Sequence, residues 1–236
     1  MISGPVLLIL LVLVVAAGLG FLTGGRLSGF DEVRLRWWPL ALLGLAMQLV
    51  PVPDLGDDLE DIVGVALLIA SFGPLLAFAT LNLRSPGFPL VLIGMLMNLL
   101  VISVNAGMPV TREALVASGQ EESLRVLEQG RGSKHHLADE DEDRLLFLAD
   151  AIGLGWPFNE VVSAGDLVLY AGAGWYVFGA LRAGAGARPE PSPERGRARG
   201  AHRKGAAGHR RPGPEPVPPG PPPASPPAAR RSGTPP

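Results

Sequence analysis

Five apolar stretches separated by polar loops constrain this chain more than any other feature of its sequence. They cover residues 5–22, 37–52, 62–83, 88–104 and 166–181. The first has no charged side chain and is long enough for the ~30 Å hydrocarbon core of a bilayer. Backbone in lipid must satisfy its own hydrogen bonds, and none of these runs alternates like a strand, so each is predicted to be a helix. The expected fold class is therefore all-α, a polytopic integral membrane protein with about five transmembrane helices.

The loops between these stretches are sorted by charge. Basic residues occupy the first loop, the turn at Arg84 and the region that begins at Arg182, whereas residues 53–61 carry only acidic charges. The long segment 105–163 has five basic residues against eleven acidic ones. By the positive-inside rule, this segment and the N-terminus lie outside a cell (plasma) membrane that the chain crosses several times, and the C-terminus is cytoplasmic.

A cleavable signal peptide is the alternative interpretation of the first stretch. Residues 1–5 carry no Lys or Arg, while Arg26 follows the apolar run. This order is the reverse of the usual signal-peptide charge pattern, although Ala16-Ala17-Gly18 resembles a weak cleavage site. We therefore expect the first stretch to be retained as a transmembrane helix.

Composition divides the chain near residue 183 into a membrane domain, residues 1–182, and a tail, residues 183–236. The tail holds fifteen of the twenty-four prolines and ten basic residues against three acidic ones. It cannot bury enough apolar surface to offset chain entropy, so we predict a disordered cytoplasmic tail. Its arginines could contact anionic lipid. It offers no aromatic residues for base stacking, so no specific nucleic-acid partner is expected.

Few polar side chains interrupt the apolar stretches. Gln48, Asn98 and Asn105 are predicted to form interhelical hydrogen bonds, and a polar pathway for a solute is the alternative. Asp166 follows Ser163 at the spacing of a capping box, which predicts that both residues cap the last helix. A catalytic or ion-binding role is the alternative for Asp166.

The outward segment, residues 105–163, is expected to be partly helical. Thr111 can cap a short helix over residues 112–117, and residues 121–129 place Leu124 and Leu127 on one helical face. A third short helix is predicted over residues 143–152. Helices of this length are marginal alone, so they should pack on one another or on the bilayer surface.

Within this segment, the residues best suited to catalysis or metal binding by their side chains are Lys134-His135-His136. Adjacent histidines point apart on a helix or a strand, which favours a solvent-exposed or locally bonded pair over a metal site. The acidic run 139–143 resembles the start of a calcium loop, but Arg144 and Asp150 occupy two diagnostic positions of that loop. We therefore interpret the run as solvated charges at a helix N-terminus, and expect no metal and no cofactor.

Three functions are compatible with this sequence. The first is a non-enzymatic envelope or membrane-complex component that presents residues 105–163 to a partner outside the bilayer. The second is an interfacial enzyme or metal-dependent activity using Lys134, His135, Asp150 and Asp166, the candidate catalytic residues. The third is a small-solute transporter using Gln48, Asn98 and Asn105.

Several short motifs in a fixed order carry a resemblance to a known family. They are Gly24-Gly25-Arg26-Leu27, Leu35-Arg36-Trp37-Trp38 with Gln48, Asn105-Ala106-Gly107-Met108-Pro109-Val110, Lys134-His135, Phe147-Leu148-Ala149-Asp150-Ala151-Ile152 and Ser163-Ala164-Gly165-Asp166. In these motifs the chain resembles the bacterial membrane proteins of domain-of-unknown-function family 5317, over about residues 18–182. It departs from the family pattern at Ala106 and Ala149, in the acidic run 139–143 and in the tail. The resemblance implies a multi-span membrane protein and supplies no activity.

Overall fold

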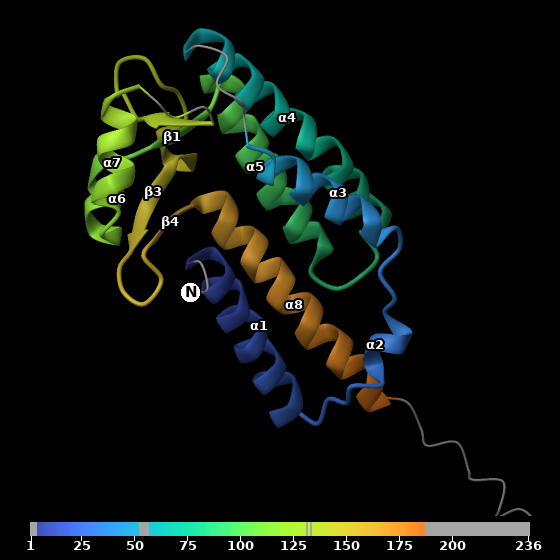
Figure 1. The fold of residues 1–236 in the computed structure, drawn as a ribbon. Coiled ribbons are helices and arrows are strands. Elements are labelled where there is room, and N and C mark those ends of the chain that lie inside the picture. The colour runs from blue at the N-terminus through green and yellow to red at the C-terminus, as the bar shows by residue number, and fades with distance from the viewer. Residues whose placement is uncertain (1–3, 52–56, 131, 133, 187–236) are drawn as a thin grey trace, which may run out of the picture. The chain divides into compact units, whose positions relative to one another are not determined.

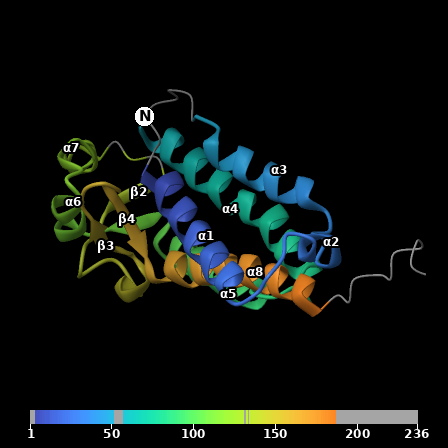
Figure 2. The ribbon, with the colours of Figure 1, turned by 90° about the horizontal axis from the view of Figure 1, so that it is seen from below.

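The computed structural model describes residues 4–51, 57–130, 132 and 134–186. The predicted disordered tail, residues 183–236, lies outside the described residues from position 187 onward. Five long helices run side by side in the described part, and a small sheet with two short helices lies at one end of them (Figures 1 and 2).

The long helices form a row in the order α3, α4, α5, α8, α1, in which each helix contacts the next. They are α1 (Gly4–Leu22), α3 (Trp38–Leu49), α4 (Asp57–Leu81), α5 (Phe88–Asn105) and α8 (Ala164–Gly186), and the short helix α2 (Gly29–Glu32) packs on α8. We call these helices the bundle. Its core is built from α4 and α5, with Phe72, Leu75 and Phe78 packed near Phe88 and Met95.

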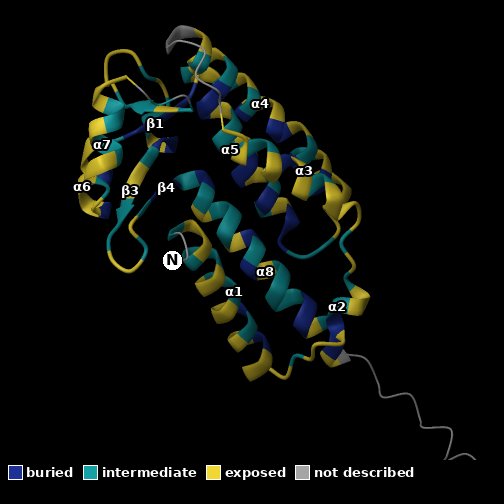
Figure 3. Cartoon of the chain, in the orientation of Figure 1, coloured by how far each residue is buried: buried dark blue, intermediate teal, exposed yellow. Residues whose placement is uncertain are grey.

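The outer faces of the bundle are apolar as well as its core. Val14 is 65% exposed, Ile62 65% and Trp175 59%, on three different helices, and exposed positions follow the outer sides of the bundle in Figure 3. A helix that is apolar all round requires an apolar environment on every side. The chain is accordingly a mostly helical protein that associates with a membrane.

Three described helices are long and apolar enough to cross a bilayer, namely Gly4–Leu22, Leu59–Leu81 and Phe88–Asn105. The predicted second span is shorter than expected, because α3 has 12 residues and a length of about 18 Å. The predicted fifth span lies within α8, whose 23 residues reach about 35 Å but include many glycines. Of the five expected spans, three therefore correspond to described helices that meet the requirement by length and composition.

Close packing in the bundle depends on glycines of α8. A Cβ added at Gly165 would lie 1.8 Å from Asn98 Oδ1, and one at Gly172 would lie 2.7 Å from the carbonyl oxygen of Gly87. On α5, a Cβ at Gly94 would meet the carbonyl oxygen of Gly165 at 2.5 Å. Small residues let two membrane helices approach until their backbones touch, so α5 and α8 form the tightest contact in the row.

The segment between α5 and α8, residues 106–163, folds into a unit that we call the cap. It contains a four-stranded mixed sheet with the order β2-β1-β3-β4, formed by β1 (Met108–Val110), β2 (His135–Leu137), β3 (Asp150–Leu154) and β4 (Glu160–Ser163). β1 pairs in parallel with β2 and β3, and β3 pairs antiparallel with β4. The all-α expectation is therefore wrong in the cap.

Two of the three short helices predicted in the cap are present. They are α6 (Arg112–Ser118) and α7 (Glu121–Glu128), and the Thr111 hydroxyl accepts the expected capping hydrogen bond from the Ala114 amide. Arg112 and Glu128 join the two helices with an ion pair. Apolar side chains of both helices cover Val110 and Val161 of the sheet.

The third predicted helix, residues 143–152, is wrong. Leu145 adopts a left-handed conformation with φ 59°, a single 3₁₀ turn follows at Leu146–Leu148, and β3 begins at Asp150. A ten-residue helix is marginal in isolation, and here the backbone of Asp150 is paired with Val110 on one side and Ser163 on the other. Sheet pairing across distant segments therefore overrides the local helical pattern.

The acidic run 139–143 has no helix to precede, so its expected position at a helix N-terminus is wrong, whereas residues 139–142 are exposed as expected. The Asp143 carboxylate instead accepts a hydrogen bond from the amide of Asp139 at 2.9 Å and contacts Nε2 of His136 at 2.9 Å. Asp139 in turn accepts from the amide of Asp141. The run closes a turn between β2 and the 3₁₀ segment, as Asp side chains commonly do.

Candidate functional site

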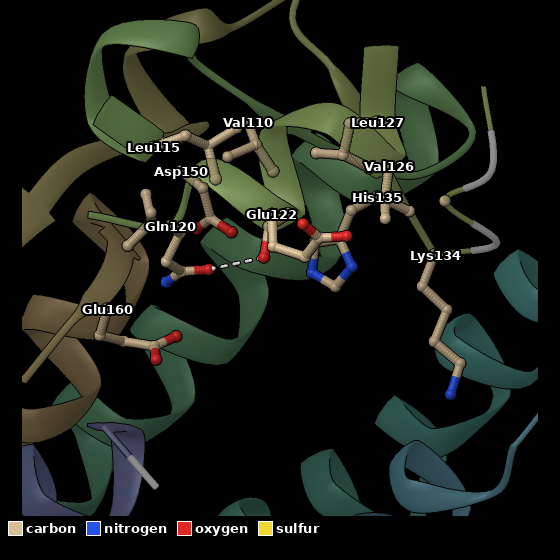
Figure 4. Close-up of a pocket in the computed structure, with 13 residues that line it drawn as sticks. Val110, Leu115, Gln120, Glu122, Val126, Leu127, Lys134, His135, Asp150 and Glu160 are labelled. Atoms are coloured by element: carbon tan, nitrogen blue, oxygen red, sulfur yellow. Dashed lines mark hydrogen bonds between the residues drawn. The ribbon is translucent and has the colours of Figure 1, made fainter. Parts of the chain in front are cut away.

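A cavity of about 490 Å³ in the cap is the best candidate for a functional site, and Figure 4 shows its lining. It lies between the sheet and helices α6 and α7. The lining residues are Val110, Leu115, Gln120, Glu122, Ser123, Val126, Leu127, Gly132, Lys134, His135, Asp150, Glu160 and Val161. A volume of this size is typical of sites for small molecules or single side chains.

One wall of the cavity is apolar. Val110, Leu115 and Val161 belong to the core between α6 and the sheet, and Leu127 packs against that core from α7. This wall exists because α6 and α7 are amphipathic and bury one face each on the sheet. It offers a surface for the carbon skeleton of a ligand.

The opposite side of the cavity is polar, and the sheet supplies it. Asp150 begins β3 and Glu160 begins β4, which run antiparallel, while His135 begins β2. The Asp150 backbone is fixed by pairing with Val110 and by its carbonyl, which accepts from the Thr111 amide at 3.1 Å. Three strands thus bring two carboxyl groups and an imidazole to one place, as the sticks in Figure 4 show.

The environment of these groups disfavours their charged forms. Burial raises the pKa of the Asp150 carboxyl well above its ordinary value of 3.8, and the charges of Asp166 and Glu160 add to the rise. Burial and Asp166 also raise the pKa of Glu160, against the lowering effect of a backbone hydrogen bond at Val161. The pocket therefore crowds carboxyl groups together, and a cation bound among them would favour their charged forms.

The pKa of His135 is lowered, as expected for a base that is partly removed from water. Desolvation by the surrounding protein, then Lys134 and His136, lower its pKa, while the charge of Asp166 opposes this effect. The residue lines the cavity, where a ligand could contact it. A neutral imidazole offers one acceptor nitrogen and one donor to a ligand.

Lys134 lines the cavity with its stem but directs its ammonium group elsewhere (Figure 4). Its Nζ donates to the carbonyl oxygens of Gln48 at 2.7 Å and Val50 at 3.1 Å, at the C-terminal end of α3. Carbonyls at a helix end lack intrahelical partners, and a cation is favoured there by the helix dipole. Lys134 therefore fastens the cap to the bundle rather than neutralising the carboxyl groups in the cavity.

Asp166 lies just below the sheet, at the start of α8. The Ser163 amide donates to Asp166 Oδ2 and the Asp166 amide donates to Ser163 Oγ, both at 3.0 Å, so the predicted capping box is confirmed. Asn98 adds a further donor, since its Nδ2 lies 2.7 Å from Asp166 Oδ1. The Ser163 hydroxyl is also within 3.0 Å of Asn98 Oδ1. This trio, which we call the joint, connects α5, β4 and α8.

The other polar residues of the predicted spans have different positions. Asn105 hydrogen-bonds through its side chain to the backbone amide and carbonyl of Arg144, which fixes the cap loop rather than a second membrane helix. Gln48 contributes its backbone carbonyl to Lys134, as described above. Asn98 is the one of the three whose described hydrogen bonds link two long helices.

The structure thus brings together three of the four candidate catalytic residues, Lys134, His135 and Asp150, at one cavity. Asp166 acts on that cavity through its charge, while its oxygens are engaged in the joint. Sequence reasoning missed Glu160. The signal was present, because Val161-Val162 follow Gly153-Leu154-Gly155 and a proline-containing turn, a pattern typical of a hairpin.

Metal binding has little geometric support in the described part of the chain. There, no three side chains of His, Cys, Asp or Glu are grouped so that they could hold a metal ion. His135 and His136 follow one another in β2, and His136 is engaged with Asp143. The cavity therefore offers hydrogen-bonding and charged groups rather than a ligand cage.

Comparison with known proteins gives one family. The model of a family of unknown function, DUF5317, matches residues 32–178, which include the row from α3 to most of α8 and the whole cap. No curated protein and no solved structure matches the chain significantly.

Proposed function

The chain belongs to the family of unknown function DUF5317, and on this premise we propose that it is a non-enzymatic component of the cell membrane whose cap binds a partner outside the bilayer. The observation that carries this proposal is the cavity of about 490 Å³ in the cap. A cavity with an apolar wall and a few convergent polar groups is the usual form of a binding site.

The proposed orientation follows from the charges at the two ends of the bundle. Five arginines lie in segments at the end opposite the cap, which we call the arginine end: Arg26, Arg34, Arg36, Arg84 and Arg182. Backbone contacts support their common location, since the Arg26 amide bonds Leu181 and the Arg36 amide bonds the Asn82 side chain. We place the arginine end in the cytoplasm and the cap outside, with α1, α4, α5 and α8 crossing the bilayer and the shorter α3 lying against α4.

The absence of cysteine in the sequence allows a direct test of this orientation. Glu140→Cys in the cap and Ser28→Cys at the arginine end both replace exposed residues. A membrane-impermeant maleimide applied to intact cells should label the cap cysteine, and should label the other only after the cells are permeabilised. The reverse pattern would overturn the orientation.

Partner binding is tested with a photoreactive side chain at two positions of the cap. Glu122 lines the cavity, whereas Glu140 is an exposed residue of the acidic run 139–143 and serves as the matched control. Irradiation of intact cells should give a discrete adduct from position 122 and none from position 140. Equal adducts at both positions, or none at either, would contradict binding through the cavity.

An acid–base enzyme is the second candidate, favoured by the meeting of His135 and Asp150 in one cavity. Opposite shifts in pKa away from the charged forms are a pattern seen in catalytic pairs. Against this candidate, Lys134 and Asp166 have structural partners. The enzyme hypothesis predicts a catalytic turnover that is lost in His135→Gln while the photochemical adduct at position 122 is retained.

The transporter hypothesis gains less support. Asn98 and Asn105, two of the three residues on which it rests, are engaged in the joint and in the cap loop. Satisfied amides of this kind stabilise packing between elements. We therefore rank it below the two functions of the cap.

A further inference from the structure

Resting on the proposed function, the geometry of the cavity points to its ligand: we propose that it binds a primary ammonium group carried on an apolar chain. Such a group occurs in small amines and in lysine side chains of partner proteins. The assignment follows from four features of the cavity, its charge, its missing counter-ion, its apolar wall and the type of acceptors that it presents.

The charge of the cavity is negative. Asp150 and Glu160 both line it, and Asp166 lies close enough below to affect each of them electrostatically. Glu122 adds a fourth carboxylate at the rim, although it is 79% exposed there and pairs with Arg125 at 3.2 Å. The cavity therefore favours a cation over an anion.

The ammonium group of Lys134, which could neutralise the carboxyl groups of the cavity, points away from them. Lys134 is the cationic residue of the lining, and its ammonium donates to carbonyl oxygens of α3 instead. Among the described residues, no hydrogen bond reaches the Asp150 side chain, which points into the cavity in Figure 4. A bound ammonium would supply both the missing charge and the missing donor.

The remainder of the cavity selects the kind of cation. Val110, Leu115, Leu127 and Val161 favour a ligand with a carbon skeleton over a hydrated metal ion. No Phe, Tyr or Trp is among the lining residues, so the aromatic cage that holds quaternary ammonium ions is absent from the described cavity. Carboxylate oxygens and a neutral imidazole are acceptors, which suit the three N–H donors of a primary ammonium.

The decisive experiment compares three probes with one apolar body. Full-length protein in nanodiscs is titrated with phenethylammonium, 2-phenylethanol and 3-phenylpropionate, with empty nanodiscs as the blank, and heat of binding is measured. Phenethylammonium should bind and the other two should not. Equal binding of the alcohol, or no binding of the ammonium, would overturn the proposal.

Variants locate the binding. Asp150→Asn should weaken phenethylammonium binding about ten- to a hundredfold, the usual value of a hydrogen bond to a charged group. Glu160→Gln should weaken it less, and the matched control Glu140→Gln should leave it unchanged. Thermal unfolding of each variant shows whether the protein still folds, and an unchanged affinity in both Asp150→Asn and Glu160→Gln would refute the site.

A second pair of probes separates the two sources of the ammonium group. A capped tripeptide Ala-Lys-Ala carries the ammonium group, and its Nε-acetylated form replaces that group with a neutral amide. Tighter binding of the charged peptide than of phenethylammonium identifies a partner lysine, and the opposite order identifies a small amine. The photochemical adduct at position 122 does not depend on these probes, so its persistence without amine binding would reject the ligand class while leaving the proposed function standing.

Discussion

Two asparagines of the bundle have close hydrogen-bond partners, whereas the Asp150 side chain in the cap cavity has none among the described residues. Asn82 bonds the backbone of Arg36 and Phe78, and Asn98 bonds Asp166. In the cavity, burial and the charges of Asp166 and Glu160 instead raise the pKa of Asp150. Paired groups stabilise a fold, and crowded like charges weaken it, so the bundle is organised for packing and the cavity for an incoming ligand.

The largest loss of stability is expected from a substitution inside the bundle, and its absence would contradict the contrast drawn above. In Gly94→Ala the new Cβ meets the carbonyl oxygen of Gly165, so α5 and α8 must separate. We expect a loss of about 3 kcal/mol in the free energy of unfolding, measured by denaturant titration in detergent micelles. The control Gly18→Ala enters open space within α1 and should be neutral or stabilising by about 0.5–1 kcal/mol. Equal destabilisation by both variants would refute the role of close helix contact.

The joint between bundle and cap should have the next largest effect. Asp166→Ala removes the acceptor of the Ser163 amide and of the Asn98 side chain. Donors left without a partner should cost about 2 kcal/mol of unfolding free energy. Asp166→Asn retains one side-chain oxygen and should cost less. An Ala variant as stable as the native chain would show that α8 is not fixed through this capping box.

A smaller loss is expected where Lys134 fastens the cap to α3. Lys134→Met keeps the apolar stem and removes the donor to Gln48 and Val50, at a cost of about 1 kcal/mol. Phenethylammonium affinity should stay the same or increase, because a nearby cation is removed. A complete loss of phenethylammonium binding in this variant would show that Lys134 takes part in ligand binding and does not only connect the cap to α3.

The smallest expected effect is a pH dependence of stability that arises from Asp150 and His135 in the cavity. The pKa of Asp150 is raised in the folded protein, so the folded state holds its proton longer than the unfolded chain does. Stability should therefore fall as pH rises above the ordinary value of 3.8 towards the raised pKa, and this fall should be weaker in Asp150→Asn. His135 acts in the opposite direction, because its lowered pKa costs stability as pH falls below 6.5. Unfolding midpoints of the native chain and the variant between about pH 4 and pH 8 test the difference.

Local pattern was sufficient for the elements whose stability is local. The uncharged run in residues 5–22 predicted α1, Thr111 predicted the cap of α6, and the spacing of Ser163 and Asp166 predicted the box that begins α8. Each depends on contacts within one helix or with the surrounding apolar phase. Such contacts can be read from adjacent residues, because the helical period places them three or four positions apart.

Pairing between distant segments decided the rest. Asp150 lies in a strand because it pairs with Val110 and Ser163, although the sequence pattern of residues 143–152 predicts a helix. The same sheet brings Glu160 to the cavity and turns Lys134 towards α3. The sequence by itself determined an apolar helical protein with sorted loop charges, since hydrophobicity and charge belong to single residues. Only the tertiary structure decided the sheet and the cavity, because strand partners and cavity walls come from segments that no local period connects.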